Sequence, residues 1–154
     1  MTKSLRLQSF LPYRCANLAE RISVALSRIY VDQFGVSIAE WRILATLAEH
    51  DRLRAQQIGA LTNMDKVRVS RAVSSLQDKK LLLKTPCEHD SRAADLRLST
   101  GGKRLYKRIV PRAMAWEQSL VEPLSGEEMA TLFQLLDKLD ARVDQLEQPA
   151  APDR

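Results

Sequence analysis

The stretch that decides the fold covers residues 37–79 and reads SIAEWRILATLAEHDRLRAQQIGALTNMDKVRVSRAVSSLQDK. Its opening letters, SIAE, have the S-x-x-E pattern of a capping box, which predicts that a helix begins here and covers 37–50. A short helix over 55–61 and a longer one over 65–79 follow. Three helices in this order, with a short one before the longest, predict a helix-turn-helix unit whose last helix is the recognition helix.

The helix predicted over 65–79 has two chemically different faces. At 100° per residue, Val69, Ala72, Val73 and Leu76 fall within one narrow arc, which we assign to the core. Arginine can pair with guanine, valine can contact the thymine methyl group, and serine or lysine can bind bases or phosphates. An ordinary basic surface helix is the alternative. The candidate DNA contacts on the other face are Lys66, Val67, Arg68, Ser70, Arg71 and Ser74.

A hairpin is expected directly after the recognition helix. Residues 81–85 are mainly apolar and residues 95–98 alternate polar with apolar side chains, which predicts two short strands joined by a protruding loop over 87–94. An arginine on such a loop can enter a narrow minor groove, where the negative potential is strongest. We therefore assign Arg92 to DNA contact, with Asp90 holding its guanidinium group in place. Helices followed by this hairpin predict a winged helix-turn-helix.

The net charge of +5 on 154 residues conceals an uneven distribution. Residues 1–116 carry 21 basic and 10 acidic side chains, whereas residues 117–154 carry 3 basic and 9 acidic ones. The predicted winged segment, 52–112, has 15 basic against 5 acidic side chains. This excess of positive charge favours a polyanionic partner, and the acidic end of the chain is expected to lie away from it.

The helices predicted outside the winged segment indicate a second copy of the chain. One begins at Pro12 and ends near Gly35, another covers about 100–120 with Pro111 inside it, and a capping box at 125–128 opens the last. A winged domain of this size cannot cover their apolar stripes, so we expect a homodimer, with an intramolecular bundle as the alternative. The stripe of the last helix consists of Met129, Leu132, Phe133, Leu136, Leu139, Val143 and Leu146.

Over roughly residues 10–147 the sequence resembles the MarR family of bacterial transcription regulators. The resemblance lies in FGVSIAEWRILATLAEH, in IGALTNMDKVRVSRAVSSLQDKKLL, and in the wing HDSRAADLRLSTGGKRLY with its D-x-R and L-x-L-[ST]-x-x-G patterns. It implies an obligate homodimer that binds a pseudo-palindromic operator in double-stranded DNA, usually as a repressor released by a small effector. Two positions depart from the family pattern: Lys80 replaces a glycine at the end of the recognition helix, and Arg54 replaces a capping Ser or Thr.

The expected fold is therefore mainly α-helical with a small β-hairpin, and it combines a winged helix-turn-helix with a helical dimerisation domain. We assign 37–98 to DNA binding, 1–36 together with 99–148 to dimerisation, and 149–154 to a flexible tail. By resemblance, an effector pocket for a phenolic or carboxylate ligand lies between these parts; the same aromatic residues can instead be core or interface anchors. Its candidate residues are Tyr13, Arg14, Trp41, Arg42 and Trp116.

Other functional classes are less well supported by the sequence. No Gly-rich phosphate loop, catalytic triad or paired-carboxylate motif occurs, so we expect neither an enzyme nor a cofactor. His50 and His89 lack the spacing of a metal site. With no long apolar run, we expect no membrane partner and a cytoplasmic location. Two alternatives stay open: a repressor of this fold that senses oxidants through Cys15, and a helical adaptor that binds protein through the basic face.

Overall fold

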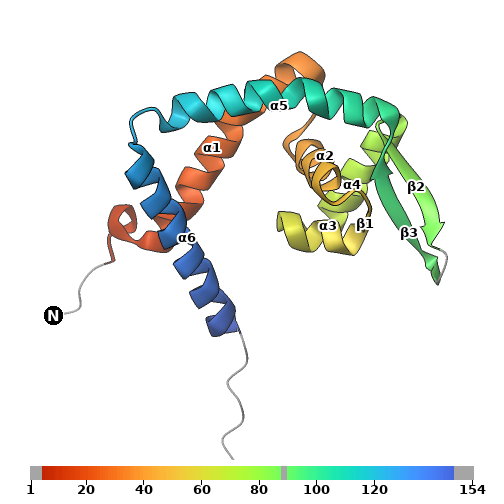
Figure 1. Ribbon diagram of the computed structural model, residues 1–154. Coiled ribbons are helices and arrows are strands. Elements are labelled where there is room, and N and C mark those ends of the chain that lie inside the picture. Colours follow the sequence, from red (N-terminus) through yellow and green to blue (C-terminus); the bar gives the residue numbers. More distant parts are fainter. Residues whose placement is uncertain (1–4, 88–89, 148–154) are drawn as a thin grey trace, which may run out of the picture. The chain divides into compact units, whose positions relative to one another are not determined.

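The computed structural model describes residues 5–87 and 90–147, without the side chains of 87 and 90–93. It is mainly helical and contains two compact units, one ending at Met114 and the other beginning at Ala115 (Figure 1). Among the described residues, no helix is long and apolar enough to cross a bilayer. The elements in chain order are the 3-10 turn η1 (Leu7–Ser9), α1 (Leu11–Phe34), α2 (Ile38–His50), β1 (Leu53–Arg54), α3 (Ala55–Thr62), α4 (Lys66–Asp78), β2 (Leu82–Cys87), β3 (Asp90–Leu98), α5 (Thr100–Val121) and α6 (Gly126–Glu147).

The ends of the helices follow the local signals in the sequence. Gly35 ends α1 in the left-handed conformation, with φ of 63°. Ser37 and Glu40 form the predicted capping box at the start of α2. The carboxylate of Asp65 accepts a hydrogen bond from the Arg68 N–H at 2.8 Å and caps α4. The predicted positions of these helices are therefore confirmed to within a residue or two.

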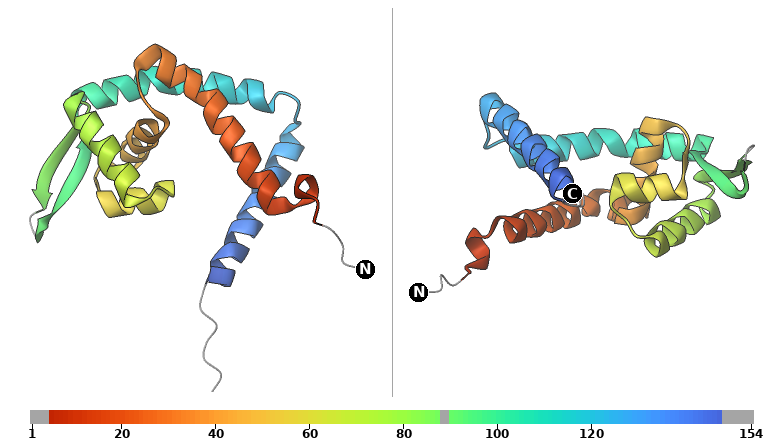
Figure 2. Two further views of the ribbon diagram at one scale, coloured as in Figure 1. Left: turned by 180° about the vertical axis from the view of Figure 1, so that it is seen from behind. Right: turned by 90° about the horizontal axis from the view of Figure 1, so that it is seen from below.

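The wing differs from the simple hairpin that the sequence predicted. Its strands are longer than expected, since β2 reaches Cys87 and β3 begins at Asp90, so most of the predicted loop over 87–94 is strand. The short strand β1 also pairs with β3, placing Leu53 opposite Leu96 in an antiparallel sheet of order β1-β3-β2. In Figures 1 and 2, β2 and β3 lie side by side and extend away from the helices of the first unit.

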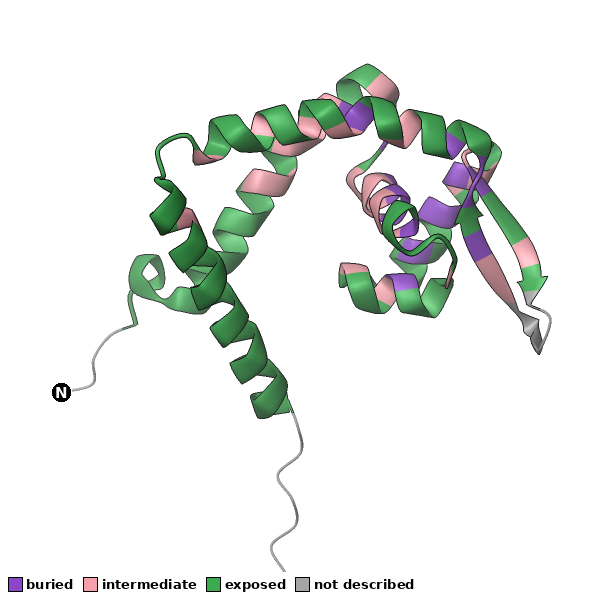
Figure 3. Ribbon diagram, viewed as in Figure 1, coloured by how far each residue is buried: buried purple, intermediate pink, exposed green. Residues whose placement is uncertain are grey.

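The core of the first unit lies among α2, α3, α4 and the sheet (Figure 3). Val69, Ala72, Val73 and Leu76 of α4 are all buried, as predicted. The apolar pattern of α2 predicts a buried face of Trp41, Leu44, Ala45, Leu47 and Ala48. This prediction was partly wrong, because Ile43 and Glu40 are buried while Ala48 is exposed. The orientation of the helix brings Glu40 to Ser75 and Lys79 at the end of α4. The spacing of apolar residues in α2 does not predict these polar contacts.

Helix α5 begins at a tight junction with the recognition helix. The hydroxyl of Ser99 accepts a hydrogen bond from the Gly102 N–H at 3.0 Å, as expected of a cap, and donates one to the Lys80 carbonyl at 2.8 Å. Lys80 itself adopts φ of 58°, so this chain keeps a left-handed turn there with lysine in place of glycine. Helix α5 continues through Pro111.

The second unit contains the end of α5 and all of α6. Ser125 and Glu128 form the predicted capping box, with hydrogen bonds of 2.8 and 3.2 Å. Apart from Met129, which is half-buried, the predicted apolar stripe of α6 is exposed in the single chain, at 41% for Leu132 and 67% for Leu146 (Figure 3).

Candidate nucleic-acid interface

The candidate DNA contacts on α4 all lie on its solvent-exposed side. Because the opposite side of the helix is fixed in the core, their side chains project from a rigid support. Val67 is 58% exposed, so its side chain is available for an apolar contact with a partner. The exposed candidates are Lys66, Val67, Arg68, Ser70, Arg71 and Ser74.

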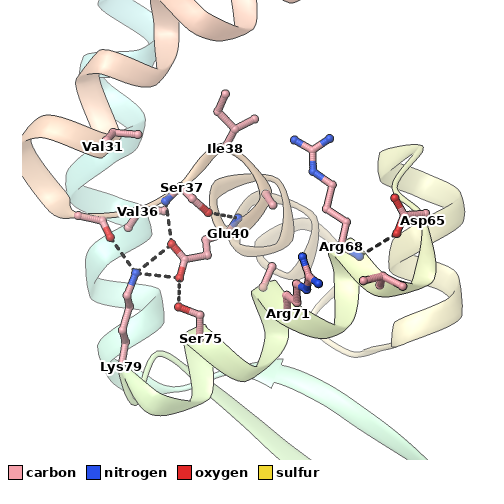
Figure 4. Close-up of a pocket in the computed structure, with 14 residues that line it drawn as sticks. Val31, Val36, Ser37, Ile38, Glu40, Asp65, Arg68, Arg71, Ser75 and Lys79 are labelled. Atoms are coloured by element: carbon pink, nitrogen blue, oxygen red, sulfur yellow. Dashed lines mark hydrogen bonds and ion pairs between the residues drawn. The ribbon is translucent and has the colours of Figure 1, made fainter.

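Arg68 and Arg71 border an open cavity between α4 and the beginning of α2. The cavity has a volume of about 850 Å³, and Figure 4 shows both guanidinium groups extending from α4 along the same side of it. Both arginines are exposed, and neither forms a side-chain hydrogen bond or ion pair within the part of the chain that the structure describes. Their donors are therefore available to a partner with acceptor groups.

At the other end of this cavity, the Glu40 carboxylate joins α2 to the last turn of α4 (Figure 4). Its oxygens lie 2.7 and 2.9 Å from the Lys79 ammonium group, and one accepts a hydrogen bond from the Ser75 hydroxyl at 2.6 Å. Burial alone would raise the pKa of Glu40, but the hydrogen bonds from Lys79, Ser75 and the Ser37 backbone lower it below its ordinary value. The carboxylate is therefore charged at neutral pH.

The wing supplies the second part of the candidate interface. Asp90 and Arg92 lie at the beginning of β3, but their side chains are outside the described residues, so the expected contact between them stays a prediction. Closer to the helices, the Arg52 guanidinium group lies 3.6 Å from the Asp95 carboxylate, which is 18% exposed. This ion pair connects the segment between α2 and β1 to β3.

The structure brings together only part of the predicted effector pocket. Trp41 stacks between Tyr30 and Tyr106, with ring centroids 5.4 and 5.8 Å apart, and the adjacent Arg42 donates to the Ser23 hydroxyl at 3.4 Å. Burial raises the pKa of Tyr30, and Arg42 lowers it to a smaller extent. The other predicted pocket residues belong to different places: Tyr13 and Arg14 are exposed near the beginning of α1, and Trp116 lies in the second unit.

Two features of the structure are absent from the sequence prediction. The two tyrosines beside Trp41 were missed because the stack joins side chains from three different helices, α1, α2 and α5, and such contacts leave no periodic pattern in the sequence. Arg108 and Arg112 both lie over the Phe34 ring, at 5.2 and 5.4 Å from its centroid. Their spacing of four residues was a usable signal, since it places both on one side of α5.

Cys15, the candidate oxidant sensor, lies on α1 and is exposed in the single chain. Cys15 is therefore not a buried packing residue within the single chain. Its role in oxidant sensing stays a prediction.

Comparisons with known proteins agree with this arrangement. The model of the MarR family matches residues 34–93, which contain α2, α3, α4 and most of the wing. A MarR/EmrR family transcriptional regulator from Acinetobacter sp. ADP1 is 30% identical and superposes with a TM-score of 0.83 over 92% of this chain and 99% of its own. The transcriptional regulator PecS of Dickeya dadantii is 28% identical over 77% of this chain and 73% of its own length. A mutant MarR from E. coli, complexed with operator DNA, has the same fold, with a TM-score of 0.76, 20% identity, and coverage of 89% and 99%.

Proposed function

The chain belongs to the MarR family of transcriptional regulators, and we propose that it is a homodimeric repressor that binds a pseudo-palindromic operator in double-stranded DNA. Like the relatives it matches, it is a regulator and not an enzyme. In this proposal residues 37–98 bind DNA, and 1–36 together with 99–148 form the dimer. Its place of action is the cytoplasm, where the operator is found.

The observation that carries the proposal is the arrangement of α4. Its apolar side is buried, and its opposite side presents Arg68, Arg71 and Val67 to solvent, without side-chain partners for the two arginines among the described residues. A helix of this kind fits the major groove, where arginine reads guanine and valine contacts the thymine methyl group. Lys66, Ser70 and Ser74 flank these groups and suit contacts to phosphates or base edges.

The exposed apolar side chains of α6 support a second copy of the chain as partner. Leu136, Leu139 and Val143 of the predicted stripe are 42, 41 and 50% exposed in the single chain. Leaving so many large apolar groups in water is unfavourable, and a symmetric dimer would bury the same stripe of both copies. The two recognition helices would then reach half-sites about 34–36 Å apart, which is one turn of DNA.

The stack around Trp41 supports an effector with an aromatic ring and a carboxylate or phenol group. Trp41 lies next to Arg42, whose guanidinium group can pair with an anion. In the proposal, an effector bound there shifts the dimer to a form that does not fit the operator. Release of DNA then follows from the preference of the effector for that form.

The test begins with duplex DNA. Purified protein is used to select bound fragments from random or genomic DNA, and its affinity for a selected duplex is measured by fluorescence anisotropy at several salt concentrations. We expect a selected sequence with two related half-sites, a steep loss of affinity with salt, and a dimeric mass in sedimentation. Release by small aromatic acids is then measured on the selected duplex. A protein that shows no salt-dependent binding to any duplex would overturn the proposal and favour the adaptor alternative.

A further inference from the structure

Lys79 lies at the end of the recognition helix, and although its side chain is 39% exposed, its ammonium group is paired with a buried carboxylate. Its ammonium group contacts the two Glu40 oxygens at 2.7 and 2.9 Å and the Gly35 carbonyl at 2.8 Å (Figure 4). The two carboxylate oxygens lie on one side of the ammonium group and the Gly35 carbonyl accepts from another N–H, so the charge of Lys79 is already paired with Glu40 within the chain. Although Lys79 belongs to a basic helix, its ammonium group is therefore held by a carboxylate of the same chain in this arrangement.

Glu40 is the centre of a polar cluster that also contains Lys79, Ser75 and the backbone of Gly35 and Ser37. Only 3% of the surface of Glu40 is exposed. One oxygen accepts from the Ser75 hydroxyl at 2.6 Å, and the other from the Ser37 backbone N–H at 2.7 Å. Together with Lys79, the carboxylate therefore connects the end of α1, the beginning of α2 and the last turns of α4. These charged hydrogen bonds are short and directional, so they restrain the direction of α4 in addition to its apolar contacts with the core.

The direction of α4 decides where its base-reading side chains point. Arg71 stands one turn before Ser75, and Arg68 stands almost two turns before it, on the side of α4 that lines the cavity. Side chains that read bases must be held to about 0.5 Å by the residues that support them. A small rotation of α4 at its C-terminal end would displace both guanidinium groups from the base edges.

We propose that Glu40 and Lys79 are positioning residues of the recognition helix, which set operator specificity without contacting DNA. The inference rests on the proposed function, because it assumes that α4 reads an operator. It differs from the simpler interpretation, in which Lys79 is one more phosphate contact on a basic helix, and from a role limited to stability.

The experiment compares Glu40→Gln, Lys79→Gln and the double variant in the full chain. Affinity is measured for the selected operator and for a scrambled duplex, each over a range of salt concentrations. We expect each single variant to lose on the order of tenfold in the ratio of operator to scrambled affinity, a loss equivalent to one poorly placed base contact. The double variant should match the single variants within about twofold, because both changes break the same connection.

Salt dependence separates positioning from phosphate contact. Each phosphate contact adds about 0.9 to the slope of log affinity against log salt on B-form DNA. We therefore expect Lys79→Gln to keep the slope of the wild-type protein, while its specificity ratio falls. Loss of folded protein lowers both affinities by the same factor, so a purely structural role leaves the ratio unchanged.

The matched controls are Glu49→Gln, on the exposed end of α2, and Lys107→Gln, on the exposed side of α5. Each control removes a charge of the same sign as its matched variant, but outside the cluster. Both should therefore keep the ratio of operator to scrambled affinity. Should a cluster variant fail to fold, Ser75→Ala removes only one hydrogen bond to Glu40 and should lower the ratio by a smaller factor.

Two results would overturn the inference. An unchanged ratio in folded Glu40→Gln and Lys79→Gln would limit the pair to stability. A slope smaller by about 0.9 in Lys79→Gln would make Lys79 a phosphate contact. If the wild-type protein binds no duplex, the proposed function has failed, and that outcome is distinct from both.

Discussion

The carbonyl oxygen of Leu81 occupies the space that a β-carbon would need at Gly102. This contact joins the end of the recognition helix to the first turn of α5, and Gly102 is buried there. We expect Gly102→Ala to lower the free energy of unfolding by about 2–3 kcal/mol or more, because a backbone oxygen cannot move aside without displacing the chain. Urea denaturation followed by circular dichroism measures this change.

Gly126 provides the control for that substitution. A β-carbon there meets no atom within 4 Å, and the residue begins α6. Gly126→Ala should therefore leave the free energy of unfolding unchanged or raise it by up to about 1 kcal/mol. An equal loss of unfolding free energy in Gly102→Ala and Gly126→Ala would contradict the steric explanation at Gly102.

Lys80 adopts a conformation that favours glycine, with φ of 58°. We expect Lys80→Gly to raise the free energy of unfolding by about 0.5–1 kcal/mol, because the strain of a side chain in the left-handed region is removed. The reverse change is Gly35→Ala at φ of 63°, where nothing crowds the position, and it should cost about 1 kcal/mol. Thermal denaturation of both variants tests this prediction. Shifts of the melting temperature in the same direction would contradict the explanation by strain in the left-handed region.

The helix ends were predictable because their signals are local. Ser37 with Glu40, and Ser125 with Glu128, lie three residues apart, so each capping box can be recognised in the sequence before any tertiary contact is known. The strand β1 could not be found in this way. Leu53 pairs with Leu96, and a two-residue strand has no periodicity of its own, so only the packing of the sheet defines it.

The same distinction applies to the candidate interface. The two faces of α4 follow from helical periodicity, and the buried positions agree with it. Periodicity also puts Ser75 on the exposed face, beside Ser74, yet Ser75 is half-buried and donates to Glu40, 35 residues earlier in the sequence. A polar contact across that distance leaves no periodic pattern, so the cluster around Glu40 became visible only in the structure.

Glu40 should make the stability of the protein depend on acidity. Its pKa in the folded chain lies below the ordinary value of 4.5, so the unfolded chain binds the proton more readily. Its contribution is therefore complete above pH 4.5 and is lost as the pH falls through the folded value.

We expect Glu40→Gln to lower the free energy of unfolding by about 1–3 kcal/mol at pH 7, and by less as the pH decreases below 4.5. Urea denaturation of the wild-type protein and of Glu40→Gln, repeated at about each pH unit between pH 3 and pH 7, measures the difference between their free energies of unfolding. Glu49→Gln, whose side chain is 77% exposed in the wild-type protein, is the control and should show little change at any pH. A difference that grows on acidification would contradict the assignment.

Arg68 and Arg71 should contribute to the choice of bases and not only to the strength of binding. Each guanidinium group is exposed on α4 and can form two hydrogen bonds with one guanine. We expect Arg68→Ala and Arg71→Ala each to cost about 1–3 kcal/mol on the operator and to relax selection at one position of the half-site. Lys66→Ala, at a position suited to phosphate, should instead weaken all duplexes alike and lower the salt slope by about 0.9. Repeating the selection from random DNA with each variant separates these effects. Equal losses on operator and scrambled DNA for all three would mean that the arginines bind only the backbone, and base reading would then have to come from other residues.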